Sequence, residues 1–550
     1  MRKILIKYES INVIISFLFI IVLEFCFFRT YAYREVIGNI PRNADQLSYM
    51  TVSYSLYENL ILRDWHKIVT IIRSRCLTGG IPIIGVINLF VFGRGYFSFL
   101  LMNFFAYSLV QIIGGISVYT ITEKKRYIYI FIGLFLALMS PFYWAGDLLD
   151  FRQDFIAFCL YTCWVTLYVV YLYNNSKRFF YLSAWFGGVL VFCRMLSIVY
   201  ICIVLLLINL YYVFIYKKVS FRKQIINMFC YAFVMILCGG WFLIIRLKNF
   251  FYYYVNLHAK DLEPDIRAKE QKIYDLGDNI SFYPKSLIVD HLGIYISIIA
   301  VVILLFVVVV YICNRKKYMA NQRVCVLFSC LTIITPIVIL TLDVSKSSVV
   351  VNIVSGCVVW LLTLLIFFSL DYKKNLVFGL VIICSLIGAY SYISNSISQH
   401  RGYSAQEQKT LIKINSEIAE YIIEENLKEP HILVDHLFDS IKNESVTYWL
   451  AEKYKKNIYV YNAIQTMNPS LDGLNIQSEV ARTFSEEEIQ ESLLCADIVV
   501  ISPEGYEDSL YVTDQQFDNY REMMWDYVND NMKLLLEERI NGTDISVFVR

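Results

Sequence analysis

The chain has 550 residues, of which 57% are hydrophobic and only 17% are charged. Charged residues make up about 25% of a typical soluble domain, so this chain has too few to cover a water-soluble globule of its size. The composition therefore excludes a soluble enzyme, a nucleic-acid-binding protein, a coiled coil and a disulfide-stapled secreted domain. The net charge of +2 points to no class of partner.

Apolar blocks of about 20 residues recur along the chain, and a helix of that length can cross a bilayer. They predict a polytopic α-helical membrane protein with about 11 transmembrane helices. We expect the spans at 10–29, 98–122, 127–145, 153–173, 179–196, 198–216, 225–246, 292–313, 323–342, 347–370 and 375–393. The first span contains Glu24 and has no small-residue cleavage site, so we interpret it as a membrane anchor and not as a signal peptide.

Clusters of lysine and arginine occur at every second boundary between spans. They are Arg2, Lys3 and Lys7; Lys124 to Arg126; Lys177 and Arg178; Lys217, Lys218, Arg222 and Lys223; Arg315 to Lys317; and Lys373 and Lys374. Short basic loops are typical of the cytoplasmic side, which predicts a cytoplasmic N-terminus and an extracytoplasmic C-terminal region. Few prolines and many Ile, Lys, Asn and Tyr residues suggest an AT-rich bacterial gene, and hence the plasma membrane.

Three segments fall outside the predicted spans, and this topology places all three on the outer face. Loop 30–97 contains a predicted amphipathic helix over 52–75, lying in the membrane interface. Loop 247–291 is charged at 258–278. These loops belong to a transmembrane domain over 1–395, which a soluble domain over 396–550 follows.

The soluble domain is predicted to be a small α/β domain with a mostly parallel sheet, because helical and apolar segments alternate in it. We expect helices at 405–427, 444–455, 485–495 and 514–538, and strands at 431–435, 458–461, 498–501 and 545–548. It has no glycine-rich nucleotide-binding motif. Asp435 and His436 follow a predicted strand, and we interpret them as a solvated strand end.

Acidic residues gather near the outer ends of the spans. Asp45 follows the first span, and Asp147, Asp150 and Asp154 lie around the loop between the third and fourth spans. In a helical segment the last three would share one face. Acids close to hydrocarbon are costly unless they face water or a cation, so these are candidate site residues. The alternative is that they cap helix ends at the headgroup level.

The stretch from Asp45 to about Leu210 resembles membrane glycosyltransferases of the GT-C fold, most closely the protein-mannosyltransferase and aminoarabinose-transferase group, glycosyltransferase family 39. The similar motifs are Asp45-Gln46-Leu47-Ser48-Tyr49, Gly80-Ile81-Pro82 with Phe92-Gly93, Ser140-Pro141, Arg152-Gln153-Asp154, and Arg194. Two features depart from the family pattern: Gln46 replaces a second acid, and the usual His-Pro-Pro is absent. The resemblance implies a GT-C-like transmembrane domain and a polyprenyl-phosphate-sugar donor.

Chemistry at these positions fits an inverting transfer of a hexosyl or pentosyl group to an acceptor hydroxyl. The hydroxyl needs a general base, for which we expect Asp45, with Asp154 as the second catalytic acid. The departing phosphate needs cations and not a general acid. Candidate substrate-binding residues are Arg75, Arg152, Arg194, Arg246, Lys248 and Tyr49. Arg194 has the strongest case because it interrupts an apolar stretch, although it could also extend to the outer interface.

No cofactor is predicted. The six histidines are dispersed, so a dedicated metal site is unsupported, although Asp45 and Asp154 could hold a divalent cation. Glu24 could pair with Arg194 or line the cavity. Expected partners are a polyprenyl-phosphate-linked sugar, membrane lipids and a glycan, lipid or protein acceptor, with no nucleic acid.

Three alternatives remain open from the sequence. An O-antigen-type polysaccharide polymerase or ligase would have a large late outer loop, whereas the loops at 343–346 and 371–374 are short. A transporter of lipid-linked glycans would have helices broken by glycine and proline, with several mid-span charges, and this chain has only 9 prolines. A non-catalytic scaffold is the third.

Overall fold

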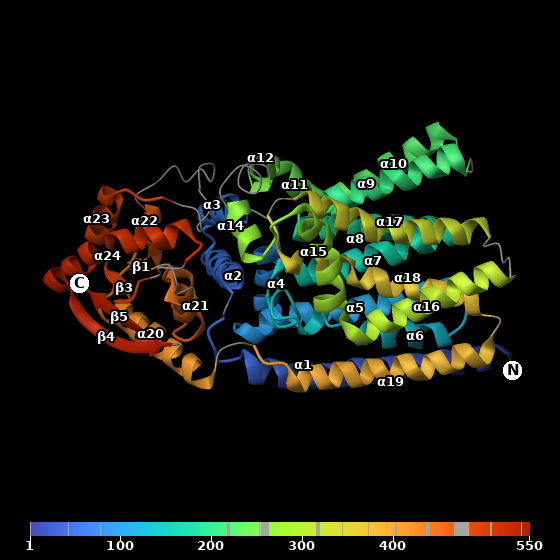
Figure 1. The fold of residues 1–550 in the computed structure, drawn as a ribbon, viewed down its shortest axis with the longest axis horizontal. Coiled ribbons are helices and arrows are strands. Elements are labelled where there is room, and N and C mark those ends of the chain that lie inside the picture. The colour runs from blue at the N-terminus through green and yellow to red at the C-terminus, as the bar shows by residue number, and fades with distance from the viewer. Residues whose placement is uncertain are drawn as a thin grey trace.

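The structure is a computed structural model that describes residues 2–550 except 42, 77–78, 217–219, 252, 255–262, 315–318, 344, 372, 402–403, 436–440, 467–482, 506–508 and 541. It consists of a long bundle of apolar helices with a smaller α/β region at one end (Figure 1). The polytopic helical fold with a C-terminal α/β region is therefore confirmed.

The bundle accounts for every predicted span with a helix. Its helices are α1 (Arg2–Glu35), α5 (Tyr96–Thr122), α6 (Arg126–Leu136), α7 (Gln153–Asn174), α8 (Lys177–Cys193), α9 (Ser197–Leu210), α10 (Phe221–Met235), α11 (Trp241–Ile245), α16 (Gly293–Asn314), α17 (Ala320–Leu342), α18 (Ser355–Leu370) and α19 (Lys374–Ser398). Within the described residues, nine helical stretches are long and apolar enough to cross a membrane. The predicted spans at 127–145 and 179–196 are the shorter helices α6 and α8.

At the centre of the bundle lies α7, where nearly every side chain is buried from Asp154 to Leu172. α5, α8, α17 and α18 pack around it. The span predicted at 292–313 corresponds to α16. It is preceded by α15 (Leu276–Ser286) and a π-helical turn (Leu287–Leu292), which ends at Gly293 with a left-handed φ of 75°.

Close helix contacts in the bundle depend on glycine. A Cβ on Gly388 of α19 would overlap the carbonyl oxygen of Gly133 on α6, whereas no described atom lies within 4 Å of a Cβ on Gly379 of the same helix. Without a hydrophobic force between helices in lipid, such small residues allow backbones to approach. We therefore expect Gly388→Leu to lower the unfolding free energy by about 1–3 kcal/mol. Thermal unfolding in detergent measures this, and Gly379→Leu is the control; equal melting temperatures of the two variants would contradict the prediction.

One end of the bundle carries basic loops, and the other carries the α/β region. Lys124 and Arg126, between α5 and α6, pair with Asp371 at the end of α18. That loop and the start of α1 lie at the end farthest from the α/β region, and α19 runs the length of the bundle towards that region (Figure 1). Burial is outweighed by the pairing with Lys124, Tyr127 and Arg126, so the pKa of Asp371 is lowered.

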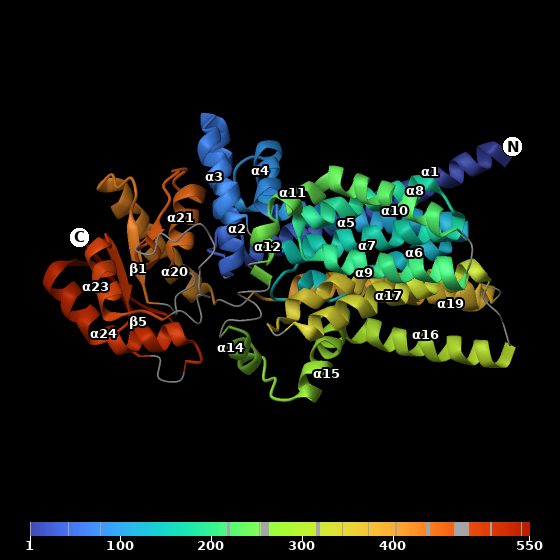
Figure 2. The same cartoon turned by 90° about the horizontal axis from the view of Figure 1, so that it is seen from above.

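Between the bundle and the α/β region lie the helices α2 (Ala44–Leu62), α3 (Trp65–Arg75), α4 (Ile81–Phe92), α12 (Leu247–Phe251) and α14 (Glu263–Glu270), as both views show (Figure 2). The single helix predicted over 52–75 is wrong. The chain breaks at Arg63, whose φ of 59° is left-handed and whose N–H caps α2. α2 packs on α4 and on α21 (Asn443–Glu452) of the α/β region, so only α3 keeps the character of a separate amphipathic helix.

The α/β region contains α20 (Ala405–Glu424), α21 (Asn443–Glu452), α22 (Ala463–Thr466), α23 (Glu486–Cys495) and α24 (Val512–Asn531). Its strands are β1 (His431–Val434), β2 (Tyr461–Asn462), β3 (Ile498–Ile501), β4 (Lys533–Ile540) and β5 (Thr543–Val549), in the order β2-β1-β3-β5-β4. β1 is parallel to β2 and β3, whereas β5 is antiparallel to β3 and β4. The sheet is therefore mixed, and not mostly parallel.

Hydrogen bonds fasten this region to the bundle side through α21. Glu452 accepts hydrogen bonds from the Tyr54 hydroxyl of α2 and from the Tyr96 N–H at the start of α5, the latter at 3.3 Å. The Thr51 hydroxyl donates to the carbonyl of Glu444 at 3.4 Å. The C-terminal region is thus attached directly to α2 and to the start of α5.

Candidate active site

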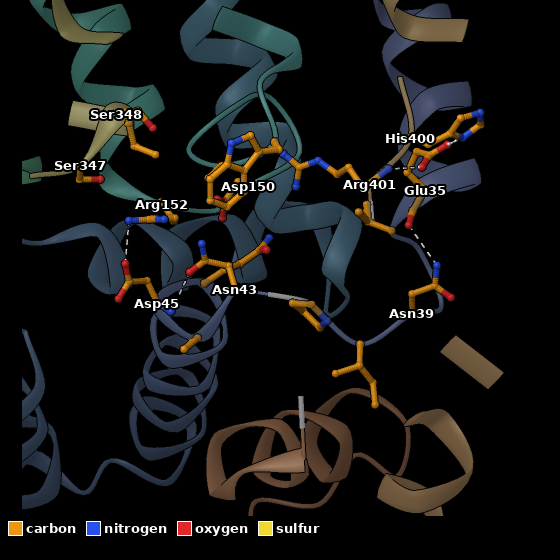
Figure 3. A pocket seen from close by; sticks show the side chains of 18 of the residues that line it. Glu35, Asn39, Asn43, Asp45, Asp150, Arg152, Ser347, Ser348, His400 and Arg401 are labelled. Atoms are coloured by element: carbon orange, nitrogen blue, oxygen red, sulfur yellow. Dashed lines mark hydrogen bonds and ion pairs between the residues drawn. The ribbon is translucent and has the colours of Figure 1, made fainter. Parts of the chain in front are cut away.

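A cavity of about 710 Å³ lies at the end of the bundle that faces the α/β region. Its walls come from the end of α1, the start of α2, the loop before α7, α14, the loop before α18, and the linker from α19 into α20. Figure 3 shows Asp45, Asp150 and Arg152 on one side of it and Glu35, His400 and Arg401 on the other. The cavity therefore joins segments that lie almost 400 residues apart in sequence.

Four of the predicted residues form a continuous chain of ion pairs. Arg152 Nη2 lies 2.7 Å from Asp45 Oδ2, and Arg152 Nε lies 3.5 Å from Asp154 Oδ2. Arg194 Nη1 lies 2.8 Å from Asp154 Oδ1. The Asp45 side chain is 58% exposed, whereas Asp154 and Arg194 are 3% and 4% exposed. The chain of ion pairs thus runs from the open cavity into the interior of the bundle.

Local structure explains why these side chains meet. Asn43 caps α2 and accepts a hydrogen bond from the Asp45 N–H at 2.9 Å, so Asp45 lies in the first turn. Asp154 lies in the first turn of α7, and Arg194 is the C-cap residue of α8. Acids at helix N-termini and cations at C-termini interact favourably with the helix dipole. Asp45, Asp154 and Arg194 are therefore each stabilised by their own helix before the pairs form, whereas Arg152, the N-cap residue of α7, is not.

Donors around Arg194 remain available. Arg194 Nε, the Ser197 hydroxyl and the Tyr200 hydroxyl are buried and have no hydrogen-bond partner among the described residues. They lie at intervals of three residues where α8 ends and α9 begins. Buried polar groups without partners are rare, and they call for a water, an ion or a ligand.

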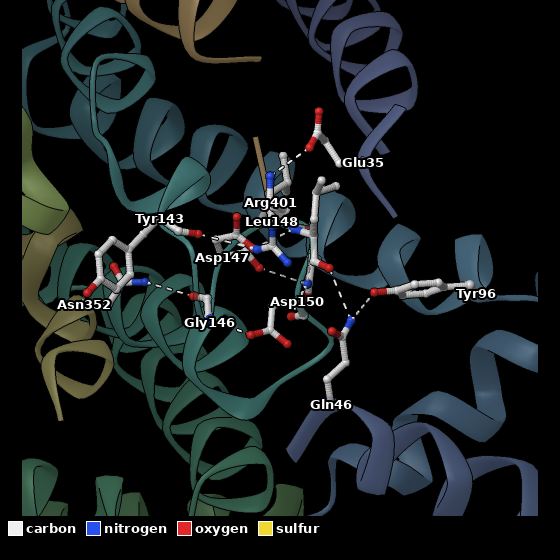
Figure 4. Close-up of polar contacts among 12 residues, drawn as sticks. Glu35, Gln46, Tyr96, Tyr143, Gly146, Asp147, Leu148, Asp150, Asn352 and Arg401 are labelled. Atoms are coloured by element: carbon white, nitrogen blue, oxygen red, sulfur yellow. Dashed lines mark hydrogen bonds and ion pairs between the residues drawn. The ribbon is translucent and has the colours of Figure 1, made fainter. Parts of the chain in front are cut away.

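The loop from 143 to 152 is held by an ion pair and by hydrogen bonds to its backbone (Figure 4). Asp147 is fully buried and pairs with Arg401 from the α19–α20 linker. The Asn103 amide of α5 donates to the carbonyls of Asp147 and Asp150, at 3.3 and 2.8 Å. Gly146 has a left-handed φ of 61°, and a Cβ there would lie 2.6 Å from a methyl carbon of Val349. The loop conformation thus depends on glycine and on buried polar contacts.

The three acids Asp147, Asp150 and Asp154 do not share a helix face, so the conditional helix of the sequence argument is wrong. Residues 143–152 form bends and turns, and α7 begins only at Gln153. All three residues are nonetheless buried. Burial raises the pKa of Asp150 to about 7, although Arg152 opposes this shift.

Gln46 has a clear role in this position. Its amide Nε2 donates to the Tyr96 hydroxyl at 2.7 Å and to the Leu149 carbonyl at 3.3 Å (Figure 4). An ionised acid has no donor to make either bond. The departure from the family pattern therefore ties α2 and α5 to the acidic loop.

The remaining predicted substrate-binding residues divide into two groups. Tyr49 lies one turn after Asp45, and its phenol interacts electrostatically with Arg152 and Arg194. Arg246 instead donates to the Arg73 and Cys76 carbonyls at the end of α3, the latter at 3.1 Å, and Lys248 is exposed on α12. Arg75 ends α3, but its side chain lies outside the described residues.

Two other sequence interpretations need correction. Glu24 does not pair with Arg194, because it is buried and accepts a hydrogen bond from Gln111 of α5 at 2.6 Å. Asp435 is not a solvated strand end: it is 1% exposed and pairs with Arg521 of α24 at 2.6 Å. Burial raises the pKa of Asp435 to about 6. His436 lies outside the described residues.

Sequence reasoning missed Arg401, which contributes two contacts to the cavity wall. Its side chain pairs with Asp147, and its N–H donates to Glu35 Oε2 at 2.8 Å. The available signal was the position of Arg401 shortly after the last predicted span. Arg152 lies between Asp45 and Asp154, where a divalent cation held by both acids would sit. Within the described residues there is no group of three or more metal-ligating side chains.

Comparison with known proteins gives a structural relative. No protein-family model and no curated protein matches the sequence. The structure is similar to that of ArnT from Cupriavidus metallidurans bound to undecaprenyl phosphate, with a TM-score of 0.60, 11% identity and coverage of 98% of each chain. The apo structure of the same ArnT gives a TM-score of 0.47 at the same identity and coverage. The chain therefore has the GT-C-like membrane fold of ArnT, as its sequence resemblance predicted.

Proposed function

We propose that this protein is an integral-membrane glycosyltransferase that transfers a hexosyl or pentosyl group from a polyprenyl-phosphate donor to an acceptor hydroxyl. The observation that carries the proposal is the chain of ion pairs from Asp45 to Arg194, which lines and extends from a cavity at one end of an ArnT-like bundle. Because the related ArnT was solved bound to undecaprenyl phosphate, we propose this lipid as carrier here also.

In this reaction the acceptor oxygen attacks the anomeric carbon while the bond from that carbon to the phosphate oxygen breaks. The bonding electrons leave with the phosphate, and the configuration at the anomeric carbon is inverted. Asp45, the most exposed acid of the chain of ion pairs, takes the hydroxyl proton. Asp154 acts as the second acid by holding Arg152 and Arg194 in place.

Phosphate is bound by the guanidinium groups of Arg152 and Arg194, whose forked donors suit its oxygens. The buried groups Arg194 Nε, Ser197 Oγ and Tyr200 OH add three hydrogen-bond donors, which are in place before any ligand binds. Such preorganised donors stabilise charge that develops on a leaving group. Tyr49 of α2 interacts electrostatically with both arginines.

The orientation in the membrane follows from the distribution of basic loops. Lys124, Arg126 and the start of α1 lie at the end opposite the cavity, which supports a cytoplasmic placement of that end. The cavity and the region after α19 are then extracytoplasmic, at the level where the headgroup of a lipid-linked sugar lies. In a bacterium this membrane is the plasma membrane, and the acceptor is a glycan, a lipid or a protein.

The test measures the product that every donor sugar and acceptor would share. Purified protein in nanodiscs is incubated with a panel of undecaprenyl-phosphate pentoses and hexoses and with membrane extracts as acceptors, and free undecaprenyl phosphate is measured by mass spectrometry. We expect release with at least one donor, with the sugar recovered on an acceptor. Movement of an intact donor across a vesicle membrane without release would favour a transporter and contradict the proposal.

A further inference from the structure

Asp150 is the buried acid of the cavity that has no counterion of its own. Its Oδ2 accepts the Gly146 N–H at 2.7 Å, whereas its Oδ1 is buried and has no hydrogen-bond partner among the described residues. The side chain is 1% exposed and contributes to the cavity wall beside Asp45 and Arg152 (Figure 3). An acid so placed is costly when ionised, and its neutral form has a proton to donate.

The charged groups around Asp150 come from every element that packs on it. They are Asp45 from α2, Tyr96 from α5, Asp154 from α7, Asp147 and Arg152 from its own loop, and Arg401 from the α19–α20 linker. Across the cavity are Glu35, Arg267, Glu270, Lys346 and His400. Asp147 is already neutralised by Arg401, and Arg152 and Arg194 balance Asp45 and Asp154. An ionised Asp150 therefore adds one uncompensated negative charge.

The proposed reaction changes the charge of the lipid phosphate beside this group. The donor is a phosphodiester with one negative charge, whereas the product is a phosphate monoester whose second pKa is about 6. At neutral pH the product is thus largely a dianion. A second negative charge placed close to a carboxyl group favours the protonated form of that group.

We propose that Asp150 binds a proton when the polyprenyl phosphate monoester occupies the site and releases that proton when the product leaves. This inference rests on the proposed function, because it concerns the phosphate that the transfer sets free. In this step one proton moves from solvent to the Asp150 carboxylate and forms an O–H bond there. After Asp45 has released to solvent the proton taken from the acceptor, the site carries the same total charge with the product as with the donor. Asp150 thereby links retention of the product to pH.

The direction of the effect follows from the pKa of about 7 that burial gives to Asp150. Below this value Asp150 is neutral and does not repel the phosphate. Above this value Asp150 is ionised, so when the phosphate binds, Asp150 either takes up a proton or repels the phosphate. The native protein therefore loses affinity for the phosphate relative to a protein with a neutral side chain at position 150. The phosphate titrates identically in both proteins, so the ratio of their dissociation constants isolates Asp150.

The experiment measures binding of undecaprenyl phosphate to the full chain in nanodiscs, for the native protein and for Asp150→Asn, between about pH 5.5 and about pH 8.5. Asparagine keeps the shape of the side chain and an acceptor for the Gly146 N–H. We expect the ratio of the native to the variant dissociation constant to rise from about one to roughly ten across this range. Calorimetry in two buffers of different ionisation enthalpy should also show proton uptake by the native protein near pH 7 and a smaller uptake by the variant.

Glu270→Gln is the matched control, because Glu270 is an exposed acid of the same cavity. The ratio of the native dissociation constant to that of Glu270→Gln should stay constant with pH. A constant ratio for Asp150→Asn would overturn the inference and leave the proposed function intact. Failure of the native protein to bind undecaprenyl phosphate at any pH would overturn both.

Discussion

Asp45→Asn is expected to lower kcat for sugar transfer by about 10²- to 10⁴-fold, the usual contribution of a positioned general base. The amide retains an oxygen that can accept from Arg152 Nη2, now 2.7 Å from the carboxylate. It cannot take a proton from the acceptor hydroxyl. The backbone N–H of residue 45 still donates to Asn43, so the start of α2 is kept.

Binding of undecaprenyl phosphate separates this loss of chemistry from a loss of structure. The dissociation constant and the melting temperature of Asp45→Asn should stay close to those of the native protein. Asp278→Asn serves as control, because Asp278 is a half-buried acid that also lies in the first turn of a helix, far from the ion pairs in sequence. Full transfer activity in Asp45→Asn would eliminate Asp45 as the base.

Arg194→Gln is expected to have two effects that can be separated. It removes a buried cation from Asp154, which is 3% exposed, and breaking such a pair typically lowers the unfolding free energy by about 3–5 kcal/mol. Arg152 lies 3.5 Å from the same acid and offsets part of this loss. Arg194→Gln also removes donors from the proposed phosphate site. The dissociation constant for undecaprenyl phosphate should therefore rise at least about 100-fold, which is near the upper end of the effects seen when one charged hydrogen-bonding group is removed.

The double variant Asp154→Asn with Arg194→Gln distinguishes the two effects. Removing both charges leaves no unpaired ion, so thermal stability should recover, whereas affinity for the phosphate should stay low. Arg94→Gln is the control, because Arg94 pairs with Glu58 away from this chain of ion pairs. If the double variant recovered native affinity, Arg194 would act only on structure, and the phosphate would have to bind elsewhere.

The sequence predicted the membrane bundle well because each span is a long apolar block whose signal does not depend on its neighbours. The prediction from sequence failed where tertiary contacts determine the secondary structure. Residues 533–538 are Lys-Leu-Leu-Leu-Glu-Glu, all good helix formers, and they were assigned to the helix at 514–538. In the structure α24 ends at Asn531 and these residues form β4, because pairing with β5 outweighs their intrinsic preference.

The candidate site was also predictable only in part, because single residues can be recognised from the sequence but their contacts cannot. Asp45, Arg152, Asp154 and Arg194 were found because an acid or an arginine near hydrocarbon is costly and therefore conspicuous. Which of them pair could not be deduced, since the contacts join α2, α7 and the end of α8. Asp150 resembled its neighbours in sequence, and only its burial and its unpartnered oxygen set it apart.

The pairing of Arg401 with Asp147 limits where this protein can be truncated. A truncated chain that ends after the last span would lack Arg401 together with the α/β region and would leave a fully buried carboxylate without its counterion. Loss of Glu452 would at the same time free the Tyr54 hydroxyl and the Tyr96 N–H. The sequence suggests two separable modules, but these contacts join them, and the segment after α19 contributes His400, Arg401 and Gln408 to the wall of the cavity.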